Sequence, residues 1–89
     1  MMEGNLIRRV QPEYPALARS ARIQGQVVLS AVISREGNIE NLRVLIGHPM
    51  LVRAAIEAVS KWRYKPYILN NEPVEVETQV TVNFSLSGS

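Results

Sequence analysis

The 89-residue sequence has no cysteine and no aspartate, and its single histidine is His48. Without cysteine, the chain has no disulfide framework and no thiolate nucleophile. One imidazole without an activated nucleophile, or without other ligands at a suitable spacing, supports neither acid–base catalysis nor a metal centre. The glycines form neither a GxGxxG nor a P-loop pattern. We therefore expect a protein that is not an enzyme and that uses no cofactor, catalytic residue or bound metal.

Long apolar runs and a strong charge excess are also lacking. No stretch of about 18 apolar residues occurs, so we expect no transmembrane helix within this sequence, and no signal peptide is recognisable. The net charge of +2 is too small to indicate nucleic-acid binding on its own. The length fits one domain. We expect that domain at residues 5–87, with a linker remnant at 1–4 and a tail at 88–89, all cut from a longer protein.

The C-terminal stretch EPVEVETQVTVNFSL, residues 72–86, alternates between apolar and polar side chains. Strict alternation predicts a β-strand with one apolar face and one solvated face. Typical strands have about 5–6 residues, so a strand over this whole stretch would be unusually long. Before it, Asn70 and Asn71 predict a tight turn, because asparagine tolerates the left-handed region.

Two further strands and two helices are predicted upstream. Residues 26–34 and 39–46 have strand character, and the REGN turn between them, with Gly37, predicts a hairpin. A short helix over 15–22 is expected to turn three side chains inward: Leu17, Ala18 and Ala21. A longer helix over 50–64 carries an apolar stripe at helical spacing, made of Leu51, Ala54, Ala55, Ala58, Val59 and Trp62.

The element order helix, strand, strand, helix, strand predicts an α+β fold of two layers. The hairpin strands pair with each other, and the last strand returns to pair antiparallel with the first. The expected three-stranded sheet therefore has the order second, first, third, with both helices on one face. The long last strand then lies at an edge, where one flank of its backbone has no strand partner.

Three local features permit other interpretations. His48, next to a proline at a strand–helix junction, is expected to be a turn or surface residue. Glu75 and Glu77 are neighbours on the polar face of the last strand, where two carboxylates keep an edge soluble or bind a cation. The segment KWRYKPY, residues 61–67, interleaves aromatic and basic residues, as in platforms that stack single-stranded nucleic acid. That interpretation requires Trp62 to be exposed, whereas its place on the apolar stripe predicts a core anchor.

Two longer segments resemble the TonB C-terminal domain family. They are QPEYPALARSARIQGQVVLSAVISREGNI and LIGHPMLVRAAIEAVSKWRYKP, and the similarity continues into the last strand. Tyr14–Pro15, Gly25, Gly37, Trp62-Arg63-Tyr64 and Pro66 occur in the order and at the spacing of that family. The resemblance covers about residues 7–87.

This resemblance implies a function without catalysis, in the periplasm of a protein anchored in the inner membrane. Such proteins couple the proton motive force, through ExbB and ExbD, to active uptake by outer-membrane transporters. The domain captures the TonB box, an extended segment of the transporter, as an added strand on the last strand of its sheet. The expected contact residues on that strand are Val76, Thr78, Val80, Thr81, Val82, Asn83 and Phe84. A second expected contact region is Gln11, Pro12 and Tyr14, although packing is the alternative role for the Tyr14 ring.

Other uses of the same domain remain open at this point. A TonB-like domain can be an interaction or sensory part of another membrane protein. The free edge can also pair two copies of the chain into a homodimer through the last strand.

Overall fold

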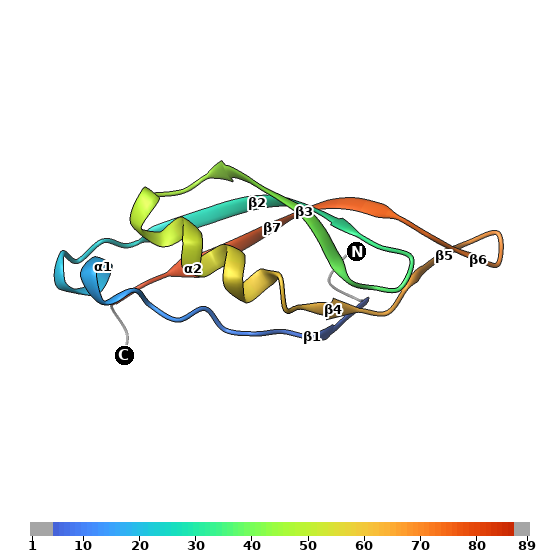
Figure 1. Cartoon of the computed structure of the whole chain (residues 1–89), viewed down its shortest axis with the longest axis horizontal. Helices are drawn as coiled ribbons and strands as arrows, with labels where there is room; N and C mark the ends of the chain where they lie inside the picture. Colours follow the sequence, from blue (N-terminus) through green and yellow to red (C-terminus); the bar gives the residue numbers. More distant parts are fainter. Residues whose placement is uncertain (1–4, 87–89) are drawn as a thin grey trace.

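The computed structural model describes residues 5–86. Its centre is an antiparallel sheet of three strands, β2 (Gly25–Ile33), β3 (Ile39–Ile46) and β7 (Val76–Phe84), in the order β3-β2-β7. This is the predicted order, with the last strand at an edge (Figure 1). The turn between β2 and β3 places Gly37 at φ +91°, where a Cβ atom would lie 1.9 Å from the carbonyl oxygen of Tyr64. Glycine is therefore required at this turn.

Two helices, α1 (Ala16–Ser20) and α2 (Pro49–Val59), lie on one face of the sheet (Figure 1). The sheet and the helices share a core in which Leu29, Ile33, Leu51 and Val59 are fully buried. The fold is thus the expected α+β arrangement of two layers. The apolar stripe of the longer helix faces this core as predicted, including Trp62, which is 5% exposed.

Both predicted helices are shorter than expected. The helix α1 buries only Ala18, whereas Leu17 is 72% exposed and Ala21 is also exposed, so the prediction of these two as inward-facing was wrong. One and a half turns of helix cannot present a wide face to the core. The helix α2 ends at Val59 instead of residue 64. Beyond it, the backbone N–H of Tyr64 donates to the carbonyl of Gly37. This contact with a residue distant in the sequence holds the backbone at residues 63–64 in an extended conformation.

Four short strands complete the structure. The strand β1 (Leu6–Arg8) pairs with β4 (Arg63–Tyr64), and β5 (Tyr67–Leu69) pairs with β6 (Glu72–Val74). The hairpin β5–β6 corrects the prediction of one long strand over 72–86, because residues 72–74 fold back on residues 67–69. The predicted turn between them is confirmed, with Asn70 and Asn71 at φ +52° and +68°.

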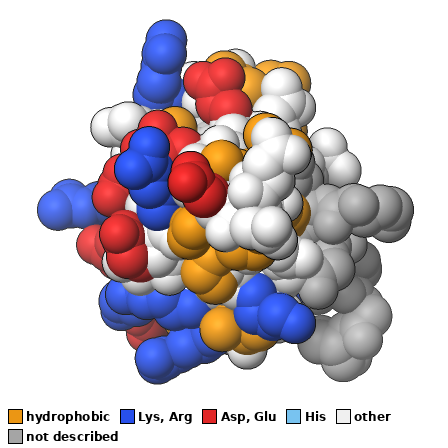
Figure 2. All heavy atoms as spheres, turned by 90° about the vertical axis from the view of Figure 1, so that its right-hand side faces the viewer, with side chains coloured by type: hydrophobic (Ala, Val, Ile, Leu, Met, Phe, Trp, Pro, Cys, Tyr) orange, Lys and Arg blue, Asp and Glu red, His pale blue; other side chains and the backbone are white. Residues whose placement is uncertain are grey.

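The β5–β6 hairpin projects from the end of the sheet (Figure 1). The view onto this end shows apolar side chains bordered by charged ones (Figure 2), and Ile68 and Leu69 are both exposed. Half-burial raises the pKa of the Tyr67 phenol at the base of the hairpin above its ordinary value. No helix within residues 5–86 is long and apolar enough to cross a membrane. Residues 1–4 and 87–89, expected to be linker and tail, lie outside the described part.

Candidate functional site

The strand β7 offers a regular backbone edge. It pairs with β2 through nine consecutive residues, from Gly25 opposite Phe84 to Ile33 opposite Val76, without a shift of register. Within residues 5–86, β2 is the only strand that pairs with β7. In an antiparallel ladder, successive residues direct their N–H and C=O groups to opposite flanks. About half of the backbone polar groups of β7 therefore face the flank that has no strand partner.

The side chains of β7 alternate as the sequence predicts. Val80, Val82 and Phe84 are buried in the core, and Val76 and Thr78 on the same face are half-buried. Thr81 and Asn83 point to the other face and are exposed. The buried side chains are committed to packing, so a partner at this edge meets mainly backbone groups and the exposed side chains. All seven residues expected on the edge strand lie on this one element.

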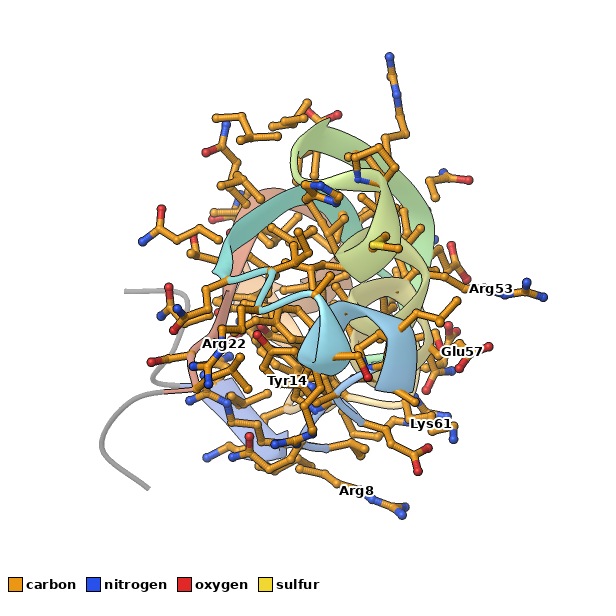
Figure 3. The ribbon with its side chains drawn as sticks, turned by 90° about the vertical axis from the view of Figure 1, so that its left-hand side faces the viewer. Arg8, Tyr14, Arg22, Arg53, Glu57 and Lys61 are labelled. Carbon is orange, nitrogen blue, oxygen red and sulfur yellow. The ribbon has the colours of Figure 1, made fainter. Side chains whose placement is uncertain are left out.

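One residue of the second expected contact region, Tyr14, lies close to the C-terminal end of β7. The ring of Tyr14 meets the ring of Phe84 edge to face, with 5.4 Å between centroids. Its phenol O–H donates to the carbonyl of Ile23, and the Arg19 guanidinium lies 4.9 Å from its centroid. Figure 3 shows Tyr14 beneath α1, pointing inward. The Tyr14 ring thus packs against Phe84. Gln11 is exposed, and Pro12 is half-buried.

A small pocket beside β7 was not predicted from the sequence. It has a volume of about 130 Å³ and is lined by Leu6, Arg9, Trp62, Tyr64, Gln79, Val80 and Thr81. Three segments that are distant in the sequence meet here, and two of them are joined by the short antiparallel pairing of β1 with β4. Little in the sequence indicated this pocket. Arg9 is one of two arginines in a segment whose apolar residues follow neither the helical nor the strand periodicity.

Trp62 holds the N-terminal segment against this side of the molecule. Its indole N–H donates to the carbonyl of Val10 at 3.0 Å, and the Arg9 guanidinium lies 5.1 Å from the ring centroid. Because the ring is buried, it cannot stack on a nucleic-acid base. The condition that the nucleic-acid interpretation required is therefore not met.

The remaining candidate residues cap a helix or lie on the surface. His48 is the N-cap of α2, where its Nδ1 accepts a hydrogen bond from the backbone N–H of Met50 at 3.0 Å. Glu75 and Glu77 are exposed. Among the described residues, no group of three histidine, cysteine or acidic side chains is placed to hold a metal ion. Arg53 and Glu57 form an exposed ion pair on α2, where Figure 3 shows both side chains pointing outward.

Comparison with known proteins agrees with this architecture. The family model described as Gram-negative bacterial TonB protein C-terminal matches residues 10–86. The chain is 33% identical to Protein TonB of Vibrio cholerae over 90% of this chain and 34% of that protein. It is 38% identical to Protein TonB of Klebsiella pneumoniae over 92% of this chain and 32% of that protein. The chain thus spans about a third of the length of these relatives.

Two solved structures share the fold. One is the solution NMR structure of the Pseudomonas aeruginosa TonB C-terminal domain, with a TM-score of 0.78 and 27% identity, covering 94% of this chain and 87% of that one. The other is from a characterisation of the TonB2 protein of Vibrio anguillarum, with a TM-score of 0.70 and 31% identity, covering 98% of this chain and 85% of that one. The chain therefore belongs to the TonB C-terminal domain family.

Proposed function

We propose that this chain is the peptide-binding end of a TonB-type energy transducer, without enzymatic activity. It takes up the TonB box of outer-membrane transporters as an additional strand on the free flank of β7. The observation that carries this proposal is the regular ladder of nine residues whose second flank has no strand partner within residues 5–86. Backbone hydrogen bonds then supply the affinity, and alternate side chains supply the selectivity.

The energetics of such an edge suit a reversible mechanical link. Each backbone hydrogen bond contributes about 0.5–1.5 kcal/mol net, and the extended peptide loses conformational freedom when it binds. A handful of bonds therefore gives an affinity of roughly micromolar to millimolar. A pull along the strand loads all of these bonds together, so the link resists sliding while force is applied and releases afterwards.

The cellular location of the chain and its further partners are inferred from the family. The chain lies in the periplasm, and the rest of the protein, outside this sequence, anchors it in the inner membrane and contacts ExbB and ExbD. The expected contact residues on β7 are Val76, Thr78, Val80, Thr81, Val82, Asn83 and Phe84, together with Gln11 and Pro12 of the N-terminal segment. The same flank of β7 is also where a second copy of the chain can pair when no peptide is bound.

The proposal is tested with a pool of synthetic peptides from the N-terminal segments of outer-membrane transporters. Each peptide is titrated into the chain by calorimetry next to a scrambled peptide of the same composition. We expect saturable binding of some native peptides, and we expect those peptides to dissociate any dimer that sedimentation detects. If no native peptide binds better than its scrambled counterpart, the proposed function is wrong.

A further inference from the structure

The hairpin that precedes β7 contains one proline, Pro73 in β6. Pro73 is exposed and lies opposite Ile68 of β5. A proline has no backbone N–H, and within sheets it is confined to strand edges, to the first residue of a strand and to bulges. The effect of Pro73 on strand pairing therefore depends on the flank to which its backbone turns.

The turn at Asn70–Asn71 determines the direction of the Pro73 backbone. In a two-residue turn, the N–H of the residue after the turn donates to the carbonyl of the residue before it. Glu72 therefore directs its backbone groups to Leu69 of β5. Directions alternate along a strand, so Val74 also faces β5, and Pro73 faces the opposite flank.

The same alternation gives the directions along β7. The backbone of Ser34 faces β3, because its N–H donates to the carbonyl of Asn38 and its carbonyl accepts from the N–H of Gly37. The preceding residue, Ile33, therefore faces β7, where it lies opposite Val76. Val76 and every second residue after it thus face β2, and the residues between them face the free flank.

The free flank of β7 continues into β6. Val74 and Val76 are half-buried and Glu75 between them is exposed, so the alternation passes through the junction and the strand stays extended there. Pro73 therefore lies on the same flank as the free residues of β7. The backbone groups of this flank belong to Pro73, Glu75, Glu77, Gln79, Thr81 and Asn83. Of these, Pro73 alone has no N–H.

We propose that Pro73 ends the edge on which β7 takes up a partner strand. The inference rests on the proposed function, because it concerns the length of the captured strand. Beside Glu75, a captured strand finds both an N–H donor and a carbonyl acceptor. Beside Pro73 it finds only the acceptor, and its own carbonyl meets the pyrrolidine ring. One hydrogen bond does not offset the conformational freedom that further residues lose on pairing, so the captured strand leaves the edge after Glu75.

A stop at this position also protects the hairpin. The β5–β6 hairpin projects from the sheet, and its Ile68 and Leu69 are 59% and 61% exposed (Figure 1). A regular free edge on an apolar hairpin invites association, and proline is one of the residues with which proteins prevent it. Pro73 thus separates the open edge of β7 from a closed edge on the hairpin.

The test compares Pro73→Thr with the parent chain by calorimetry. It uses two synthetic peptides of alternating threonine and valine, one as long as residues 75–83 and one four residues longer. We expect Pro73→Thr to bind the longer peptide about two- to tenfold more tightly than the parent chain does, because the new N–H adds a backbone hydrogen bond. Both chains should bind the shorter peptide equally.

The matched control is Glu72→Thr. Glu72 is the exposed neighbour of Pro73, and its backbone already has an N–H that faces β5. This variant should bind both peptides like the parent chain. Each comparison uses one peptide on two chains, so the larger number of registers open to the longer peptide cancels.

Amide hydrogen exchange supplies a readout that needs no peptide. In free, monomeric Pro73→Thr, the amide at position 73 should exchange rapidly, and the amide of Val74 should exchange more slowly, because only Val74 donates to β5. When the longer peptide binds, the amide at position 73 should become protected.

Each other outcome overturns the inference. If Pro73→Thr and the parent chain bind the longer peptide equally, Pro73 does not limit the captured strand, and the proposed function still stands. If Glu72→Thr gains as much affinity, or the shorter peptide gains as much as the longer one, the new N–H is not the cause. Protection of the amide at position 73 in the free monomer would place it on the flank of β5. If neither peptide binds any of these chains, both this inference and strand capture by β7 are wrong.

Discussion

The two edge strands of the central sheet, β7 and β3, differ in regularity. The strand β7 matches β2 residue by residue, whereas the pairing of β3 with β2 shifts register twice, between Val28 and Leu29 and between Ser30 and Val32. Leu45 has no partner in this register, and Asn41 lies in the second irregular stretch at φ +53°. Bulges bend an edge strand and hinder the addition of another strand.

This difference supports the proposal that the edge at β7 takes up a partner strand. Proteins normally blunt both edges of a sheet, because a regular free edge invites aggregation. Here the edge at β3 is irregular even though Val44, Leu45 and Ile46 are exposed apolar residues that would otherwise favour association. The edge at β7 is left regular and carries polar side chains on its solvent face. The contrast supports β7, and not β3, as the place for an added strand.

The largest effect is expected from proline in β7. Thr78→Pro and Thr81→Pro remove backbone N–H groups on opposite flanks of the strand, because the two positions differ in parity. One of these variants loses hydrogen bonding to β2 and unfolds. The other variant folds. Its affinity for the peptide falls roughly 10- to 100-fold, since a carbonyl group of the bound peptide no longer has a hydrogen-bond donor on β7. Circular dichroism measures folding and calorimetry measures affinity.

The matched control for this pair is Leu45→Pro in β3. Leu45 lies at a bulge, where proline is tolerated, so this variant should fold and bind peptide like the parent chain. Two folded β7 variants with unchanged affinity would contradict the role given to β7.

The second prediction removes the irregularity of β3. Deletion of Leu45 brings Val44 and Ile46 into consecutive pairing with β2, which removes one of the two register shifts and makes the edge regular over residues 43–46. We expect self-association at concentrations at least about tenfold lower than for the parent chain, because a regular apolar edge pairs readily. Sedimentation velocity across a concentration series measures this. Leu45→Thr, which keeps the bulge, is the control, and a deletion variant as monomeric as that control would refute the protective role of the bulge.

Trp62→Phe tests how the N-terminal segment is held beside β7. Phenylalanine keeps the aromatic ring but cannot donate to the carbonyl of Val10. We expect the free energy of unfolding to fall by about 1 kcal/mol, because a half-buried acceptor loses its donor. Urea denaturation followed by circular dichroism measures the change. Unchanged stability would mean that this hydrogen bond does not hold the segment.

The smallest effect is expected from Thr81→Ala. The Thr81 side chain is exposed on the solvent face of β7, and the substitution leaves the backbone intact. Peptide affinity should change by less than about twofold, because backbone groups carry the contact. A loss of more than about tenfold in calorimetry would instead assign the contact to side chains.

The sequence was sufficient to predict the sheet, because its signals are periodic. The alternation over residues 72–86 predicted a strand and its buried face, and the structure has that strand at Val76–Phe84. The asparagine pair and Gly37 predicted the turns, since their backbone conformations exclude most other residues. The apolar stripe that includes Leu51 and Val59 predicted which face of α2 is buried in the core. The position of β7 at an edge of the sheet followed from these elements and the simplest way to connect them.

The features that the sequence did not reveal depend on contacts between distant segments. Residues 63–64 continue a helical pattern, but pairing with β1 and with Gly37 draws them into an extended strand. Residues 72–74 alternate like β7 and are separated from it by Glu75 alone, and the turn at Asn70–Asn71 pairs them with residues 67–69 instead of β2. The pocket at Arg9 arises where three such segments meet. The irregular pairing of β3 likewise has no periodic signature.

Amide hydrogen exchange along the sheet, with and without a bound peptide, tests the central claim most directly. We predict that alternate amides of residues 76–84 exchange rapidly in the free monomer and become protected when peptide binds, while the amides of β3 do not change. Protection of every β7 amide in the free monomer, or new protection on β3 in place of β7, would contradict the account.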